Sequence, residues 1–337
     1  MKPDALLMSN ELNPLGVTFG SLGVLGPASV MDVAKLCVET GYQSLWTVEA
    51  TGTDAMTLLG AAAASAPGLG LGTGIIPIQL RNPTLTAMTA ATLQALNPAG
   101  DVYLGLGVSA PGILSQHGEA APKKPLAMMR EYVTLLRECL SGERVTFEGD
   151  YYQVKRFTLG MRQGERRPKI IMAALNPKML ELAGEIADGV LLNYLPVSHV
   201  APSVAAVRKG GPATIYAYVH ACAGDLEQSR KSAKRDLFNY AMADGYAKMF
   251  SSAGFEDEIA TLRSKFKEGD RDGALDAISD RMIQAIDFIG GSAQIGEFVE
   301  AYRDAGVEHP ILMPMPWGDD RWEVTRETMA AARQGRV

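Results

Sequence analysis

The chain contains few of the residues from which disulfides, metal sites and nucleic-acid interfaces are built. Its 337 residues include three cysteines, all far apart, and four dispersed histidines. This scatter excludes a disulfide framework and offers no metal-ligand spacing, so we expect buried thiols and no bound metal. The net charge is −6, and no run of Lys or Arg is longer than a pair such as Arg166-Arg167. A nucleic-acid partner is therefore disfavoured, because phosphate binding needs concentrated positive charge.

Segments that would direct the chain into a membrane are also missing. Residues 1–16 have no apolar core long enough for a signal peptide. Residues 55–80 carry no charge, but they contain Pro67, Pro77 and five glycines, which would break a spanning helix. A buried helix followed by a buried strand explains this segment better. Together with the scattered cysteines, these features predict a cytoplasmic protein with no membrane partner.

What the sequence does contain is a regular alternation of short apolar runs and amphipathic segments. Runs such as residues 102–107 and 189–193 are apolar on both faces, which is typical of parallel strands covered on both sides by helices. This alternation allows either a doubly wound sheet or a closed barrel. Eight units without a linker favour a (β/α)8 TIM barrel that forms a single domain over residues 1–337. The predicted strands span residues 15–20, 44–48, 69–76, 102–107, 169–173, 189–193, 213–221 and 309–314.

Helices are predicted between these strands, and two insertions interrupt the rhythm. Residues 144–158 predict a hairpin after the fourth helix. Residues 225–288 predict several helices after the seventh strand, with breaks near Gly254 and Gly269. The other predicted helices span residues 29–40, 54–65, 83–97, 125–140, 177–187, 198–208, 293–305 and 320–333.

The residues that follow each strand form the predicted rim of the active site, because a barrel of this kind places its site at the carboxyl ends of the strands. This rim contains one carboxylate, Glu49, one histidine, His220, and many glycine, alanine and apolar residues. It has no pair of facing carboxylates for glycoside hydrolysis and no GxSxG nucleophile. An apolar floor lined by backbone groups suits a flat aromatic cofactor that carries the chemistry itself.

The titratable candidates near this rim each have a structural alternative. Glu49 can serve as a general acid, bind a cofactor group or form a structural salt bridge. His220 lies at the end of the seventh strand and faces either the barrel interior or a covering helix. His117, in the loop after the fourth strand, is predicted near the mouth, although an exposed surface histidine is the ordinary interpretation. These three side chains are the candidates for proton transfer.

Two glycine-rich runs follow or form predicted strands. Residues 105–110 match the GxGxxA variant of the dinucleotide-binding fingerprint. We expect no helix before about Lys124, and we therefore interpret this as a chance match. Residues 68–74 carry glycine at alternate positions, which leaves one strand face bare. Such a face admits a tightly packed neighbour or a flat ring.

One helix start suits an anionic group. Asn176, Pro177 and Lys178 open a helix directly after the fifth strand. The free backbone N–H groups of a first turn, together with a lysine, attract a phosphate or carboxylate. Plain capping of the helix by Asn176 is the alternative.

Several long segments resemble the luciferase-like monooxygenase superfamily. They are a central block over residues 71–111, a helix and hairpin over residues 125–154, and residues 170–195. The segments WTVEATGTDAMTLL, residues 46–59, and AALNPKM, residues 173–179, are most similar to the F420-dependent oxidoreductase branch. The resemblance extends from about residue 15 to the C-terminus.

This resemblance implies a bacterial luciferase-like barrel with coenzyme F420 in its mouth. The implied enzyme is a reductase or dehydrogenase that transfers hydride between C5 of the deazaflavin and an organic substrate bearing C=C, C=N, C=O or an alcohol. Two alternatives stay open, an FMN-dependent monooxygenase on the same fold and a non-catalytic flavin-binding relative. We expect a small-molecule or peptide-borne substrate and a homodimer.

The resemblance also assigns the catalytic candidates. Relatives that oxidise sugar phosphates carry Ser-Asp-His-Phe after the second strand, where this chain has VEAT. Ala50 therefore replaces their catalytic histidine, which argues against sugar-phosphate oxidation by the same route. Glu49 matches their aspartate and keeps a cofactor-facing role, so a proton would come from Glu49, His117 or His220.

The cofactor contacts follow from the same resemblance. The Gly74–Ile75 bond falls where relatives often have a non-proline cis peptide. Asn176 stands where relatives usually have glycine, in the segment that meets the side-chain phosphate of the cofactor. The predicted cofactor contacts are Glu49, Thr73, Gly74, Ile75, Gly107, Val108, Ser109, Ala174, Leu175, Asn176, Pro177, Lys178, Met179 and Asn193.

Overall fold

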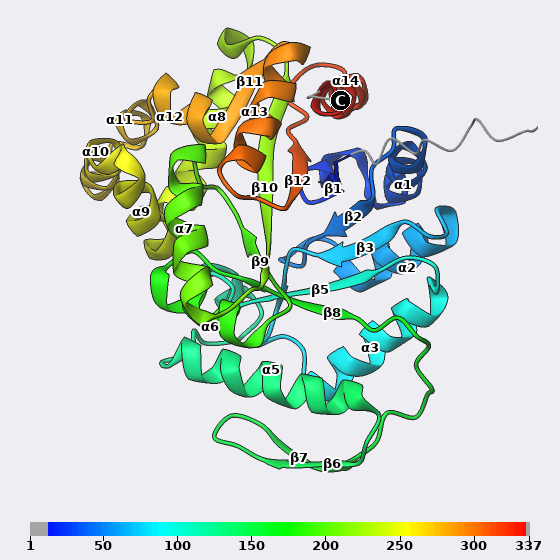
Figure 1. Ribbon diagram of the computed structural model, residues 1–337. Helices are drawn as coiled ribbons and strands as arrows, with labels where there is room; N and C mark the ends of the chain where they lie inside the picture. Colours follow the sequence, from blue (N-terminus) through cyan, green and yellow to red (C-terminus); the bar gives the residue numbers. More distant parts are fainter. Residues whose placement is uncertain (1–12, 335–337) are drawn as a thin grey trace, which may run out of the picture.

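Eight parallel strands close into a barrel in the computed structural model, which describes residues 13–334 (Figure 1). Each strand pairs with the next, and β10 pairs with both β9 and β12, which closes the sheet. This arrangement confirms the predicted (β/α)8 fold. Most of the N-terminal run that we expect to lack a signal peptide, residues 1–12, lies outside the described residues. The barrel strands are β1 (Gly16–Thr18), β2 (Ser44–Thr47), β3 (Gly70–Thr73), β5 (Val102–Gly107), β8 (Lys169–Ala173), β9 (Gly189–Leu192), β10 (Thr214–Ala223) and β12 (His309–Pro314).

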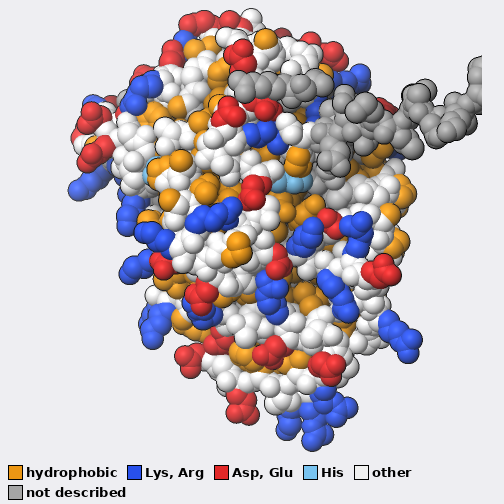
Figure 2. All heavy atoms as spheres, viewed as in Figure 1, with side chains coloured by type: hydrophobic (Ala, Val, Ile, Leu, Met, Phe, Trp, Pro, Cys, Tyr) orange, Lys and Arg blue, Asp and Glu red, His pale blue; other side chains and the backbone are white. Residues whose placement is uncertain are grey.

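Helices connect the strands around the outside of the barrel, in the segments where the apolar periodicity predicts them. Over residues 13–334, no helix is both long and apolar enough to cross a membrane. Acidic and basic side chains are interspersed over the face of the molecule shown in Figure 2. The helices of the regular units are α1 (Val30–Glu39), α2 (Ala55–Ser65), α3 (Pro83–Leu96), α5 (Pro125–Ser141), α6 (Pro177–Ile186), α7 (Val197–Gly210), α13 (Ser292–Asp304) and α14 (Arg321–Ala332).

One expectation about the helices is wrong, because a short helix, α4 (Pro111–Gln116), begins well before Lys124. Pro111 occupies its first turn, where a missing N–H breaks no helical hydrogen bond. The helix is too short to be the crossover helix of a dinucleotide-binding unit, and the chain passes through α5 before it returns to the sheet. The barrel therefore leaves the fingerprint match at residues 105–110 without its structural context.

The predicted hairpin is present as β6 (Val145–Glu148) and β7 (Gln153–Phe157), which pair in antiparallel fashion. Figure 1 shows it on the outer side of α5. The Glu131 carboxylate of α5 accepts the backbone N–H groups of Asp150, Tyr151 and Tyr152 at 2.9, 2.8 and 2.6 Å. One carboxylate thus holds the turn of the hairpin against the helix.

The second insertion contains helices, as predicted, but it ends in an unpredicted strand. Its breaks fall at Gly254 (φ +97°) and Gly269 (φ +83°), where glycine supplies a left-handed backbone conformation. The last residues of the predicted helical region, Asp287 and Phe288, instead begin β11 (Asp287–Gly290), which pairs with residues 220–223 of β10. The helices are α8 (Leu226–Ala241), α9 (Asp244–Phe250), α10 (Glu256–Lys267), α11 (Arg271–Asp276) and α12 (Asp280–Ile286), with a π-helical turn at Ser251–Phe255.

The bare glycine face of β3 is filled by an aromatic side chain of the protein itself. A Cβ on Gly72 would lie 2.4 Å from the Trp46 ring. Trp46 is fully buried and stacks on Tyr103, with ring centroids 5.3 Å apart. Of the two interpretations of residues 68–74, tight packing therefore holds at Gly72.

We expect Gly72→Ala to destabilise the protein by about 1–3 kcal/mol, because Trp46 is fully buried against Tyr103 and Tyr216 and cannot move away from the added methyl group. Gly60→Ala is the matched control, since Gly60 lies in α2 and a Cβ there meets nothing within 4 Å. Its free energy of unfolding should rise by less than about 1 kcal/mol, as helix propensity predicts. Urea unfolding measures both; an equal effect of the two substitutions would contradict the packing argument.

Candidate functional site

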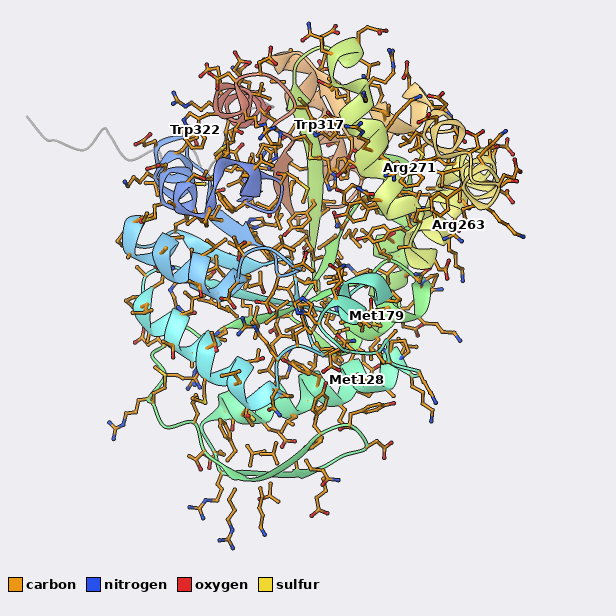
Figure 3. The ribbon with its side chains drawn as sticks, turned by 180° about the vertical axis from the view of Figure 1, so that it is seen from behind. Met128, Met179, Arg263, Arg271, Trp317 and Trp322 are labelled. Atoms are coloured by element: carbon orange, nitrogen blue, oxygen red, sulfur yellow. The ribbon has the colours of Figure 1, made fainter. Side chains whose placement is uncertain are left out.

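The segments that follow the strands meet at one mouth, as the barrel topology requires. Glu49 N–H donates to the Ile75 carbonyl at 3.0 Å, and a Cβ on Gly107 would lie 2.9 Å from the Ile75 side chain. Met179 in the first turn of α6 and Trp317 beyond β12, both labelled in Figure 3, also follow carboxyl ends of strands. The predicted rim residues therefore belong to one region of the molecule.

The third strand is interrupted within this mouth. β3 ends at Thr73, and the short β4 (Ile76–Pro77) continues beside β5. The Gly74–Ile75 peptide bond between them is cis, as the resemblance implies. The Tyr218 hydroxyl donates to the Gly74 carbonyl at 3.1 Å, and a Cβ on Gly74 would overlap that hydroxyl. Glycine at position 74 is thus required by the close approach of a tyrosine from β10.

Thr73, a predicted cofactor contact, directs its side chain toward the neighbouring strand. Its hydroxyl donates to the Gly105 carbonyl and accepts from the Gly105 N–H, both at 2.8 Å. The residue is 1% exposed. The hydroxyl therefore completes the pairing of β3 with β5 where regular pairing ends.

Glu49 forms the structural salt bridge that is one of its sequence alternatives. Arg81 donates to both carboxylate oxygens of Glu49, at 2.9 and 2.7 Å. The side chains of Arg81 and Glu49 are only 14% and 11% exposed. The hydrogen bonds that Arg81 donates to Glu49 raise the pKa of Arg81, so the guanidinium keeps its charge.

Arg81 was missed by the sequence analysis, although it stands directly before the N-cap of α3. Its guanidinium also contacts Asp54, which caps α2 by accepting the Thr57 N–H at 2.7 Å. Tyr132 of α5 donates to the Arg81 carbonyl at 3.0 Å. One arginine thus ties together the starts of two helices and the loop that carries Glu49. An arginine next to an Asn-Pro helix start is too common a combination to have identified it.

His117 lies near the mouth, and it is exposed. Its Nε2 is 2.6 Å from the Ala50 carbonyl oxygen, in the loop after β2. The contact joins the loop after β5 to the segment in which Ala50 replaces the histidine of sugar-phosphate-oxidising relatives. Of the three predicted proton-transfer residues, His117 alone is exposed.

His220 is 1% exposed and reaches the mouth only through another residue. Its Nδ1 is 2.9 Å from Oδ1 of Asp287, the first residue of β11. Its Nε2 is 3.0 Å from Oδ1 of Asn193, which follows β9. The Asn193 Nδ2 donates in turn to the Tyr246 hydroxyl of α9 at 3.1 Å. The strand end and the helical insertion are therefore connected by a chain of hydrogen bonds that neither segment of sequence reveals alone.

The start of α6 keeps the features that suit an anion. Asn176 is the N-cap residue, but its side chain accepts no helix N–H, so the plain-capping alternative is wrong. Lys178 is exposed and has no ion-pair partner among residues 13–334. Pro177 has no N–H and the Met179 N–H donates to the Asn176 carbonyl at 3.0 Å, so the side chain and the backbone N–H of Lys178 are what this helix start offers to a ligand.

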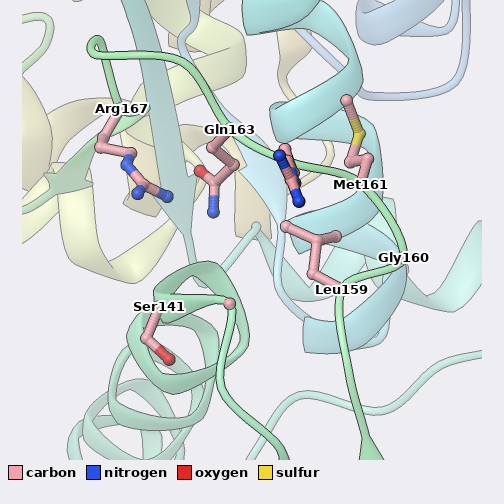
Figure 4. A pocket seen from close by; sticks show the side chains of 8 residues that line it. Ser141, Leu159, Gly160, Met161, Gln163 and Arg167 are labelled. Atoms are coloured by element: carbon pink, nitrogen blue, oxygen red, sulfur yellow. The ribbon is translucent and has the colours of Figure 1, made fainter.

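A pocket at the other end of the barrel does not belong to this site. Ser141 at the end of α5, the loop of residues 159–163 and Arg167 line it, and this loop precedes β8 (Figure 4). Arg167 donates to the carbonyl of Leu140 at 3.4 Å, so it helps to close the last turn of α5. Side chains at the amino end of a barrel serve stability rather than chemistry.

The comparisons with known proteins agree with the fold. The sequence model of the luciferase-like monooxygenase family matches residues 15–309, and the chain belongs to this family. A Mycobacterium tuberculosis protein provisionally named as a coenzyme F420-dependent oxidoreductase is 27% identical over 333 residues, covering 88% of this chain and 94% of the relative. The 5,10-methylenetetrahydromethanopterin reductase of Methanolobus tindarius is 27% identical over 307 residues, covering 87% and 91%. The solved structure of the coenzyme F420-dependent tetrahydromethanopterin reductase of Methanopyrus kandleri has the same fold, with a TM-score of 0.77 and 20% identity, covering 95% of this chain and 97% of that one.

We expect Arg81→Met to destabilise the protein by about 2–3 kcal/mol, because the Glu49 carboxylate then loses the two hydrogen bonds from Arg81 in a partly buried position. Arg130→Met is the control. Arg130 makes the same two-point contact with Glu185, but the two side chains are 48% and 51% exposed, so the loss should stay below about 1 kcal/mol. Equal losses in the free energy of unfolding, measured by urea unfolding, would show that the Arg81–Glu49 pair stabilises the protein no more than the exposed Arg130–Glu185 pair.

Proposed function

We propose that this protein is an F420-dependent oxidoreductase. The observation that carries the proposal is that every predicted catalytic side chain is already engaged. Arg81 holds Glu49, the Ala50 carbonyl contacts His117, and His220 is enclosed between Asp287 and Asn193. A rim of this kind suits a bound redox cofactor that performs the reaction. The names of the relatives favour coenzyme F420 as that cofactor.

The residues around the mouth fit such a cofactor. Apolar side chains surround Gly107, where a Cβ would lie 2.9 Å from Ile75 and 3.6 Å from Ala173, and Val108 and Ser109 beyond it are half-buried. The amide of Gln79, two residues beyond β4, has neither polar atom hydrogen-bonded within residues 13–334. An apolar floor with a few unsatisfied polar groups is what a flat heteroaromatic ligand requires.

We assign the contacts as follows. Gly74, Ile75, Gly107, Val108 and Ser109 would line the ring, and the start of α6 with Lys178 would meet the anionic side chain. When bound, F420 supplies a hydride donor or acceptor at C5 of its deazaflavin ring. The protein would exclude water and orient the substrate, and protonation falls to His117 or to water, since both carboxylate oxygens of Glu49 are occupied by hydrogen bonds from Arg81.

The test is a titration of the purified protein with F420 and, separately, with FMN, followed by fluorescence quenching. We expect saturable binding of F420 and no tight binding of FMN. Tight FMN binding without F420 binding would overturn the proposal. Oxygen consumption with reduced FMN would then identify the protein as a flavin-dependent monooxygenase, because a reduced deazaflavin does not react with oxygen in this way.

The anion contact at α6 predicts a specific loss of affinity. Lys178→Ala should raise the Kd for F420 about fivefold, as expected for one exposed charge–charge contact of about 1 kcal/mol. The effect should shrink as the salt concentration rises. Lys35→Ala on α1 is the control, because Lys35 is equally a surface lysine, with a side chain that is 58% exposed. An unchanged Kd for Lys178→Ala would show that the anionic group binds elsewhere.

A further inference from the structure

A buried polar cluster lies behind Asn193 and is unassigned by the proposed function. It consists of His220 of β10, Asp287 of β11 and Asp236 of α8. One ring nitrogen of the histidine and one carboxyl oxygen of each aspartate lie within 4.8 Å of one another. His220 and Asp287 are 1% and 0% exposed, and Asp236 is half-buried. Tyr194 donates to Asp236 Oδ2 at 2.7 Å. The Tyr194 ring also lies edge-on against His220, with centroids 3.9 Å apart.

Tyr194 has a backbone conformation that its bulky side chain disfavours, so its contacts with the cluster must hold it there. Tyr194 directly follows Asn193 and has φ +51°, a left-handed conformation that a bulky side chain rarely adopts. Its contacts to Asp236 and His220, and a stacked ring from Tyr240, retain it there. The backbone that carries Asn193 is thus shaped by the buried cluster.

Among the described residues, His220 is the one basic side chain of the cluster. No Lys or Arg among residues 13–334 forms an ion pair with either carboxyl group. Two ionised carboxylates cannot share such an environment at low cost, so the pair must hold protons. Burial raises the pKa of Asp287 well above its usual range and that of Asp236 to about 7, and burial lowers the pKa of His220 to about 4. The groups that face the cluster are Tyr194, Tyr240 of α8, Tyr246 of α9, Tyr302 of α13 and Cys222 of β10, and burial raises the pKa of each, so they are neutral.

These states assign the protons along the chain of hydrogen bonds. A neutral imidazole has one N–H, and the acceptor Asn193 Oδ1 places it on Nε2. His220 Nδ1 must then accept, and the donor 2.9 Å away is the acid proton of Asp287. Asp287 Oδ2 has no hydrogen-bond partner among residues 13–334, and a carboxyl oxygen of Asp236 lies within 4.8 Å of the polar atoms of Asp287 and His220. The protons of Asp287 and His220 therefore point from β11 toward Asn193 and the mouth.

We propose that Asp236 and Asp287 are positioning residues that act through His220 to hold the Asn193 amide with Nδ2 toward the mouth, where it donates a hydrogen bond to an oxygen of the bound cofactor. One N–H of Nδ2 is taken by Tyr246, and the second has no acceptor within residues 13–334. The Leu191 side chain of β9, two residues before Asn193, would lie 3.0 Å from a Cβ on Gly74, so this amide stands beside the predicted ring site. The inference rests on the proposed function for the identity of the ligand.

Loss of one proton from the pair of Asp236 and Asp287 reverses the direction of the hydrogen bonds from Asp287 to Asn193. The remaining acid proton is then drawn between Asp236 and Asp287, and Asp287 Oδ1 becomes an acceptor. The imidazole proton moves to Nδ1, Nε2 becomes an acceptor, and the Asn193 amide must rotate to donate to it. The mouth then faces a carbonyl oxygen in place of an N–H, which repels an oxygen of the ligand.

The test begins on the cofactor-free protein, with the imidazole nitrogens of labelled histidine followed by NMR and the His220 signals assigned from His220→Gln. We expect His220 to be the neutral Nε2–H tautomer at about pH 6 and the Nδ1–H tautomer at about pH 9. Asp287→Asn should keep the Nε2–H tautomer at both pH values, because its amide N–H donates to Nδ1 permanently. An Nδ1–H tautomer or an imidazolium at about pH 6 would overturn the proposal. Saturable binding of added Zn²⁺ that shifts these signals would also overturn it, since the cluster would then be a metal site.

The second measurement is the Kd for F420 by calorimetry. Between about pH 6 and pH 9, the Kd for F420 should rise about tenfold more for the wild-type protein than for Asp287→Asn. A tenfold change corresponds to the free energy of about one hydrogen bond to a charged group. Asn193→Ala should bind weakly at both pH values, and adding Asp287→Leu to it should cause no further loss. Additive losses in this double mutant would show that Asp287 is merely structural. If the wild-type protein shows the expected His220 tautomers but does not bind F420, the proposed function and the identity of the ligand are refuted. The hydrogen-bond chain that orients Asn193 would still stand.

Discussion

The upper half of β10 has no β9 residues beside it, and much of the mouth depends on how this open edge is covered. β10 has ten residues and β9 has four, so the backbone groups of residues 220–223 would lack partners on one side. β11 supplies these partners, and it can do so only because the chain first passes through α8–α12. The helical insertion is thereby anchored at the mouth, which brings Asp236, Tyr246 and Asp287 to His220 and Asn193.

The same packing explains why the rim has so few free catalytic groups. A carboxylate next to an apolar floor needs a partner, and Glu49 has one in Arg81. A histidine inside the barrel stays neutral because burial lowers its pKa, as at His220. Polar groups that are satisfied in this way orient a ligand well but transfer protons poorly. A fold that commits its side chains to positioning is suited to a cofactor that supplies its own reactivity.

Much of the fold could be predicted, and the failures have physical causes. The strands at residues 102–107, 169–173 and 309–314 were predicted with their observed bounds, because buried parallel strands are continuous apolar runs. β11 was missed since DFIG carries too weak a strand signal to be separated from the helix before it; its pairing is decided by the unpaired edge of β10. The α4 helix was missed because Pro111 and Gly112 read as helix breakers, although proline is well tolerated in a first turn.

The candidate site, like the fold, has features that the sequence predicts and features that only tertiary contacts decide. The sequence by itself determined the order of the elements, and therefore which residues stand at the carboxyl ends of the strands, because side-chain periodicity encodes local structure. It also contained the glycines at positions 72, 74 and 107 that allow close approach. Only the tertiary structure decided what approaches them, that Glu49 pairs with Arg81, and that a buried carboxyl pair lies behind Asn193. These contacts join residues 26 to 144 positions apart, and such pairings depend on the closure of the barrel and not on any local pattern.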